Sequence, residues 1–180
     1  KNCLKSTHNK GTEKEYSIYY HYVLEAKLVV GEIVISLDSE FVENEHENVA
    51  KQDCELRAFY RMAERIKREY PKLPIIISGD ALYACEPVMK ICKEDKWEYI
   101  IRLKEERLKQ LGEEIRGLEE VETEDKNIRY WNNIKYAEVE FEKEANILKY
   151  YEKKEEKTTE FMWITSLKIT EKNKEEHMAI

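Results

Sequence analysis

Runs of apolar residues divide the chain into extended and helical segments. Residues 16–30 are rich in Tyr, Val, Ile and Leu, and Gly31-Glu32 separates them from a second such run at residues 33–42. Two runs of this composition joined by a tight turn predict an antiparallel hairpin. Residues 1–15 are polar and carry a turn signal, so we expect a loop or the end of a hairpin there.

A helical pattern follows in residues 51–70. Apolar side chains recur there at steps of three and four residues, which predicts a helix whose apolar stripe lies on a sheet. Pro71 ends this helix, and its remaining surface is charged and should face solvent. The stripe consists of Leu56, Phe59, Ala63, Ile66 and Tyr70.

The run that ends at Asp80 is the most informative stretch of the chain. Three isoleucines between Pro74 and Gly79 predict a strand buried on both faces, as in a parallel sheet. A short helix from Glu86-Pro87 and a strand at residues 97–103 complete a βαβ unit, so the two strands should be parallel. Catalytic groups collect at the carboxyl edge of such strands, which makes Asp80 a candidate catalytic residue. An aspartate that caps the next helix is the alternative.

The second half of the chain changes character. Residues 104–124 are charged and helical in tendency, whereas aromatic and β-branched residues alternate in residues 128–151. This alternation predicts a few antiparallel strands inserted before the main sheet resumes at residues 161–167. Residues 171–180 have the composition of a helix.

Composition limits the classes of function. The 180 residues are 42% hydrophobic and carry a net charge of -7, so they can form a core but offer no overall attraction to a polyanion. No apolar run is long enough to span a bilayer. The four cysteines lack metal-ligand spacing and suggest reduced thiols in a cytoplasmic protein. They are Cys3, Cys54, Cys85 and Cys92.

Two further groups of residues could carry chemistry. Asp38 and Glu40 lie two positions apart on a predicted strand, so both carboxylates face the same side. They form a second possible acidic site, although solvated strand residues are the simpler interpretation. Cys3, His8 and His21 could belong to a zinc site only if further ligands lie upstream.

Five blocks of sequence together resemble one family. Lys51-Gln52-Asp53-Cys54-Glu55 and Gly79-Asp80-Ala81-Leu82-Tyr83-Ala84 are the most specific, and residues 36–44, 99–104 and 161–165 accompany them in order. The chain resembles the catalytic domain of bacterial insertion-sequence transposases of the DDE class over nearly its whole length. The resemblance implies an α/β fold, a ribonuclease-H-like mixed sheet with flanking helices and a β-rich insertion at about residues 107–160.

The resemblance also implies a mechanism. Such domains hold two divalent cations, Mg²⁺ or possibly Mn²⁺, between two aspartates and a glutamate, and they cleave and join DNA strands. Asp80 matches the second aspartate. The first should lie just before Lys1 and the glutamate beyond Ile180, so residues 1–180 would be a partial catalytic domain that is inactive alone.

The expected partners are DNA, meaning transposon ends and target, and a second copy of the complete protein in a homodimer. Arg102 and Lys104 are candidates for phosphate contacts. Trp131 could stack on an unpaired base, or it could simply pack the insertion. A ribonuclease-H-like fragment that binds DNA or protein without catalysis is the alternative function, and a resolvase or ribonuclease on the same fold is a third.

Overall fold

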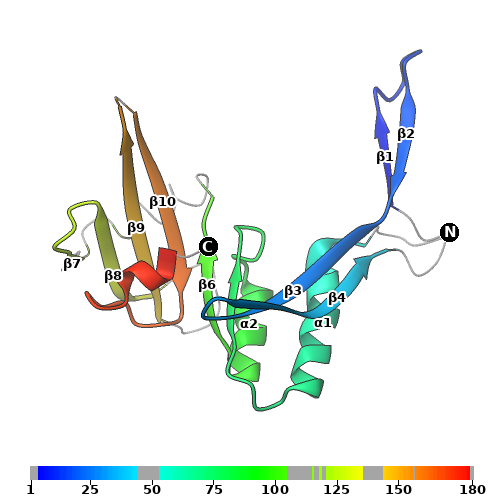
Figure 1. Cartoon of the computed structure of the whole chain (residues 1–180). Helices are drawn as coiled ribbons and strands as arrows, with labels where there is room; N and C mark the ends of the chain where they lie inside the picture. The colour runs from blue at the N-terminus through cyan, green and yellow to red at the C-terminus, as the bar shows by residue number, and fades with distance from the viewer. Residues whose placement is uncertain are drawn as a thin grey trace. The chain divides into compact units, whose positions relative to one another are not determined.

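The computed structural model describes residues 4–43, 53–104, 115, 118, 121–135, 144–155 and 157–178. The chain divides into two compact units, an amino-terminal unit of Lys1–Leu73 and a carboxyl-terminal unit of Pro74–Ile180 (Figure 1). Among the described residues, no helix has the length and apolar character needed to cross a membrane.

Two hairpins form the strands of the amino-terminal unit. β1 (Leu4–His8) pairs with β2 (Tyr16–Tyr20), and β3 (Tyr22–Val30) pairs with β4 (Ile33–Val42), both antiparallel. The second hairpin confirms the prediction and closes at a two-residue turn, where Gly31 takes a positive φ of 60°. A positive φ suits the turn types that join twisted strands, and glycine adopts it without strain.

A β-bulge sets which side chains of β4 face the helix. The β3–β4 ladder passes from the pair Ala26–Asp38 to the pair Lys27–Ser36, which leaves Leu37 as an extra residue in β4. Side chains alternate along a strand, so Asp38 and Glu40 then share one face with the buried Val42.

Helix α1 (Glu55–Glu69) packs on β4. The predicted stripe is largely correct, although Met62 and Ala58 join it and Tyr70 lies beyond the helix with 40% of its surface exposed. The first residues of the predicted helix, 51 and 52, lie outside the described residues. Leu4, Val42 and Ala58 form a small buried cluster at the base of the first hairpin. The helix buries Ala58, Phe59, Met62, Ala63 and Ile66.

The carboxyl-terminal unit begins with the predicted βαβ arrangement. β5 (Ile76–Gly79) is followed by α2 (Glu86–Asp95) and β6 (Glu98–Arg102), and β5 and β6 are parallel, with Gly79 opposite Ile101. Glu86 and Pro87 stand in the first turn of α2, where proline needs no hydrogen-bond partner.

The rest of this unit completes one sheet. The strand order is β5-β6-β10-β9-β8-β7, with every pair antiparallel except β5–β6. The strands expected in the insertion are therefore hydrogen-bonded into the same sheet as β5 and β6. These further elements are β7 (Val121–Glu122), β8 (Ile128–Lys135), β9 (Glu144–Lys154), β10 (Lys157–Thr165) and the 3-10 helix η1 (Lys174–Met178).

Both faces of the central strands are covered. Met162, Trp163 and Ile164 follow one another in β10 and are each at most 5% exposed, although successive side chains point to opposite faces. On one face, Ile169 and Met178 from the segment that ends in η1 pack against the sheet (Figure 1). The cluster on this face comprises Ile100, Ile128, Tyr130, Leu148, Trp163 and Ile169.

Several predictions about detail were wrong. Among the strands that the structure describes, β5 lies at the edge of its sheet, and Ile76 is 53% exposed, so β5 is not buried on both faces. β3 and β4 form a separate two-stranded sheet among the described residues instead of joining β5 and β6. Within the predicted helix at 171–180, residues 174–178 form a short 3-10 helix and residues 179 and 180 lie outside the described residues. Most of the helix predicted at 104–124 also lies outside them. The α/β class with a mixed sheet is confirmed, and it is compatible with a ribonuclease-H-like fold.

Candidate functional site

Asp80 follows the last residue of β5 and is exposed at the carboxyl end of that strand. Its Oδ1 atom accepts a 2.8 Å hydrogen bond from the backbone N–H of Leu82, and its carbonyl oxygen accepts a 3.1 Å bond from the N–H of Tyr83. The side chain therefore holds the turn that leaves the strand. The sequence placed this carboxylate correctly at the carboxyl edge of the sheet.

Gly79 and Tyr83 fix the shape of this turn. A Cβ atom on Gly79 would lie 2.9 Å from Cδ2 of the Tyr83 ring, closer than such atoms pack. Tyr83 is buried, so its ring has little room to withdraw. A glycine immediately before Asp80 thus allows the aromatic ring to close over the end of β5.

Cationic side chains lie at the same edge of the sheet. Gly79 stands opposite Ile101, so Asp80 and Arg102 each follow one position later on adjacent parallel strands. Arg102 is exposed, with its guanidinium 4.8 Å from the centre of the Phe161 ring, and Lys104 is also exposed. A cation stacked on an aromatic ring keeps its hydrogen-bond donors available to a phosphate.

A metal site is not complete within the described residues. They contain no group of three or more His, Cys, Asp or Glu side chains arranged to hold a metal ion. Asp80 supplies one exposed carboxylate, with one of its oxygens already bonded to a backbone N–H. Since Mg²⁺ takes about six oxygen ligands, this carboxylate alone does not match a two-metal centre.

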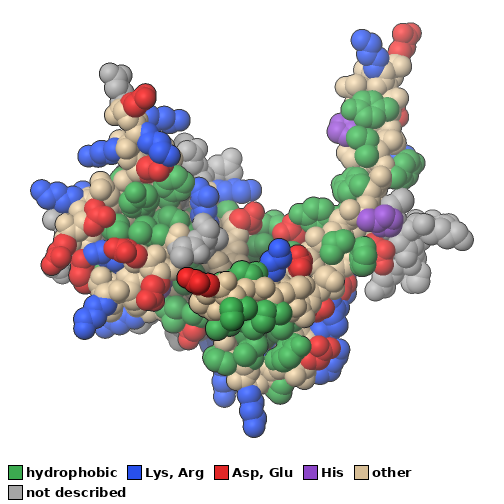
Figure 2. Space-filling model, in the orientation of Figure 1, with side chains coloured by type: hydrophobic (Ala, Val, Ile, Leu, Met, Phe, Trp, Pro, Cys, Tyr) green, Lys and Arg blue, Asp and Glu red, His purple; other side chains and the backbone are tan. Residues whose placement is uncertain are grey.

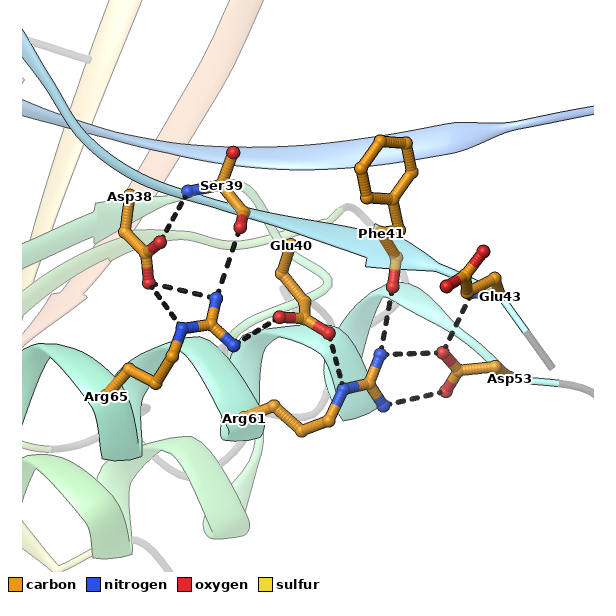
Figure 3. Close-up of polar contacts among 8 residues, drawn as sticks. All are labelled: Asp38, Ser39, Glu40, Phe41, Glu43, Asp53, Arg61 and Arg65. Carbon is orange, nitrogen blue, oxygen red and sulfur yellow. Dashed lines mark hydrogen bonds and ion pairs between the residues drawn. The ribbon is translucent and has the colours of Figure 1, made fainter. Parts of the chain in front are cut away.

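The second acidic cluster is occupied by arginines (Figure 3). Arg61 donates from Nε to Glu40 at 2.7 Å and from Nη2 to Asp53 at 2.8 Å, while Arg65 donates to Asp38 at 3.0 Å and to Glu40. The carbonyl oxygens of Phe41 and Ser39 accept further bonds from the two guanidinium groups. We call this group of Asp38, Glu40, Asp53, Arg61 and Arg65 the arginine clasp.

The clasp perturbs the pKa of Glu40, Asp53 and the two arginines. Burial opposes the ionisation of Glu40, but hydrogen bonds from Arg61 and Arg65 outweigh burial and hold its pKa below the ordinary value of 4.5. Burial likewise opposes the ionisation of Asp53, and its bonds from Arg61 and backbone N–H groups lower its pKa. Hydrogen bonds to Asp53 and Glu40 raise the pKa of Arg61. The carboxylates are charged and satisfied, which favours a structural role over metal binding.

Trp131 does not offer a stacking surface. It lies in β8 and is 6% exposed, so the hypothesis that it stacks on a base is not supported, and packing within the sheet accounts for it. Burial of the Trp131 indole ring within the sheet is favoured over its exposure for stacking on a base, because the ring has a large apolar area. Alternation in the sequence indicated the strand but not which of its faces would be covered.

β9 and β10 extend as a two-stranded ribbon at the carboxyl edge of the sheet. β10 pairs with β6 only over residues 163–165, where Trp163 stands opposite Arg102. Its earlier residues pair with β9 alone, as far as the pair Lys157–Lys154. Cations also contact aromatic rings at the base of this ribbon, where Arg129 lies 5.6 Å and Lys149 5.5 Å from the ring centre of Tyr151. Charges in residues 149–160 balance, with four lysines, Lys149, Lys153, Lys154 and Lys157, and four glutamates, Glu152, Glu155, Glu156 and Glu160. Ion pairs join Lys149 to Glu160 at 2.7 Å and Lys154 to Glu152 at 3.0 Å.

Comparison with known proteins identifies a family. Residues 43–179 match the family described as Transposase DDE domain group 1. The matched segment contains Asp80, Arg102 and most of the arginine clasp. No curated protein matches the chain.

Proposed function

The chain belongs to the transposase DDE domain family, and from this premise we propose that it takes part in metal-dependent cleavage and joining of DNA strands. The observation that carries the proposal is the position of Asp80 at the carboxyl end of β5, one residue past the Gly79–Ile101 pair that brings Arg102 alongside. A carboxylate and a cation at one sheet edge suit a site that handles a phosphodiester.

Asp80 is proposed as a metal ligand of the transposase. Its carboxylate is a hard oxygen ligand of the kind that Mg²⁺ prefers, and Mn²⁺ could replace it. When bound in pairs, such ions activate a nucleophile and stabilise the leaving oxygen. The described residues show no further carboxylates assembled with it, so we propose Asp80 alone as a ligand.

DNA is the proposed partner. Exposed Arg102 and Lys104 support contacts to phosphates, which fix the position of a duplex without reading its sequence. We propose that about residues 107–160 serve as the inserted subdomain that carries the β9–β10 ribbon. A homodimer of the transposase is proposed with it.

The decisive experiment replaces Asp80 with Asn in the transposase that carries this domain in the cell. Asn keeps the shape of the side chain but removes its charge, so cleavage of labelled element ends in Mg²⁺ should fall by a factor on the order of 10³ or more. Asp125→Asn is the matched control. Asp125 is also exposed and accepts a backbone bond two residues along, from the N–H of Asn127, but it follows β7 instead of β5.

Both variants are first compared with wild type by thermal unfolding, because in each an amide oxygen replaces a carboxylate oxygen as the acceptor of the same kind of turn bond. Full cleavage by the folded Asp80→Asn protein would reject the metal-ligand assignment. Loss of cleavage in the Asp125→Asn protein as well would show that the assay reports turn geometry and not the charge of Asp80.

A non-catalytic DNA-binding or protein-binding module is the second candidate. The observation that favours it is that the described residues contain no group of three or more His, Cys, Asp or Glu side chains arranged to hold a metal ion. The 180-residue chain alone should not nick supercoiled plasmid in Mg²⁺ or Mn²⁺, because one carboxylate cannot position two ions. Nicking that disappears in Asp80→Asn would contradict this expectation and remove the non-catalytic alternative.

A further inference from the structure

The first hairpin presents apolar side chains on a ribbon that pairs with no further strand among the described residues. Tyr16, Ile18 and Tyr20 alternate along β2 and therefore share one face, with 51%, 45% and 40% of their surfaces exposed. Figure 2 shows hydrophobic side chains along this arm. An isolated two-stranded ribbon is marginally stable in water and gains stability from further strands or from packing.

The two edges of the ribbon differ in charge. β1 carries Lys5 and His8, and edge strands with lysines are protected from pairing with other chains. β2 has the sequence Tyr-Ser-Ile-Tyr-Tyr, without charge, proline or glycine, and its ladder with β1 runs without a bulge. β2 therefore lacks the features that usually prevent a strand edge from pairing with another chain.

We propose that β2 pairs edge to edge, antiparallel, with β2 of a second copy of this chain. The two hairpins then form one four-stranded sheet with β1 strands outside. Pairing of all five residues places Ile18 opposite Ile18 of the partner subunit and Tyr16 opposite Tyr20 of the partner subunit. The three apolar side chains of each copy form one continuous strip on one face, and no charged side chains of β2 oppose each other.

Charge favours a second copy over a polyanion. Residues 4–20 contain Lys5, Lys10 and Lys14 against Glu13 and Glu15, three positive and two negative charges, for a net charge of +1 with His neutral. The exposed stripe itself contains only Tyr and Ile. Binding to DNA through phosphates requires several cations on the contact face, which this strand does not have.

The first test introduces like charges at the proposed symmetry axis. Ile18→Lys places two lysines opposite each other across the dimer and removes an apolar contact, so the dimer dissociation constant measured by sedimentation should rise at least about tenfold. Ile33→Lys is the matched control, because Ile33 is 62% exposed in the other hairpin of the same unit. It should leave the dissociation constant unchanged. Circular dichroism checks that both variants fold.

The second test uses a gain of signal. Opposed residues of antiparallel strands have Cα atoms about 4.5–5.5 Å apart, a separation that a disulfide spans. Ile18→Cys should therefore form a covalent dimer under mild oxidation, in excess over the wild-type chain and over Ile33→Cys. A wild-type chain that stays monomeric, or a dimer unaffected by Ile18→Lys, would overturn the proposal. So would a monomer whose β2 amides gain protection from hydrogen exchange only on addition of duplex DNA.

Discussion

Two strands show how differently the units of this chain are stabilised. In β10, Met162, Trp163 and Ile164 are at most 5% exposed, whereas Ile33, Val34 and Ile35 in β4 are at least 52% exposed. The carboxyl-terminal unit buries both faces of the central strands of its six-stranded sheet. In the described part of the amino-terminal unit, helix α1 packs on the β3–β4 hairpin, with the arginine clasp between them. Apolar burial thus stabilises the carboxyl-terminal unit, while charge-assisted hydrogen bonds supplement the thin apolar core of the amino-terminal unit.

The largest effect on stability is expected in the carboxyl-terminal unit. Leu148 is fully buried, so Leu148→Ala should lower the free energy of unfolding by about 2–5 kcal/mol through lost apolar burial and a cavity. Urea unfolding followed by tryptophan fluorescence measures this unit, because Trp97, Trp131 and Trp163 all belong to it. Leu118→Ala, at a 47% exposed position, should cost less than about 0.5 kcal/mol. An equal loss of unfolding free energy for Leu148→Ala and Leu118→Ala would contradict the view that apolar burial stabilises this unit.

The next effect concerns the clasp. Arg61→Met keeps an apolar stem but leaves Glu40 and Asp53 without a shared donor, so the amino-terminal unit should lose about 1–2 kcal/mol. Hydrogen exchange of α1 amides reports on this unit, which contains no tryptophan. Arg57→Met, at an exposed position of the same helix, is the control and should leave the exchange rates nearly unchanged. If the α1 amides exchange equally fast in both variants, the clasp adds nothing to the stability of this unit beyond the change in helix propensity from Arg to Met.

Low pH should weaken the clasp and leave the apolar core unaffected, and the resulting loss of stability should be smaller than that of Arg61→Met. The pKa of Glu40 is lowered in the folded protein, so its contribution is complete above its ordinary pKa of 4.5 and is lost as pH falls through the lower folded value. Asp53 behaves in the same way from its ordinary value of 3.8 downward. Thermal unfolding followed by circular dichroism should therefore show a loss of stability below these values. Glu40→Gln should flatten that dependence, and an unchanged pH profile would show that the carboxylate is not stabilised in the folded state.

The smallest effect is expected at an ordinary surface pair. Lys90 and Glu94 stand one turn apart in α2 at 3.9 Å, with 52% and 63% of their side chains exposed. Lys90→Met should change the free energy of unfolding by no more than about 0.5 kcal/mol, because water screens the pair. A cost equal to that of Arg61→Met would mean that burial and shared donors add nothing to the clasp.

Local sequence patterns predicted the helices and strands better than they predicted which strands pair with each other. The apolar run that follows the Gly31-Glu32 turn predicted β4 with the bounds Ile33–Val42, and the carboxyl end of β5 was correctly placed before Asp80. The burial of β5 was misjudged because an apolar run records only that a strand is hydrophobic. Which strands flank it is decided by pairings distant in sequence, such as the one between β10 and β6.

The clasp was missed although a signal for it exists. Asp38 and Glu40 lie two residues apart on a strand, about 7 Å along it, while Arg61 and Arg65 lie four residues apart on a helix, about 6 Å along it. These spacings match, so a helix packed on that strand can pair both sets at once. A helix surface considered alone shows only charged residues, and charged residues on a helix usually face water.

The clasp and the bulge at Leu37 together constrain how the gene for this domain can change in length. One residue inserted between Leu37 and Asp38 would turn Asp38 and Glu40 away from α1 and place their neighbours against the arginines. Two inserted residues would restore the facing of these carboxylates, since side-chain direction repeats every second position. Homologous genes should therefore differ in length at the Gly31-Glu32 turn, or by an even number of codons within the strand, and seldom by a single codon there.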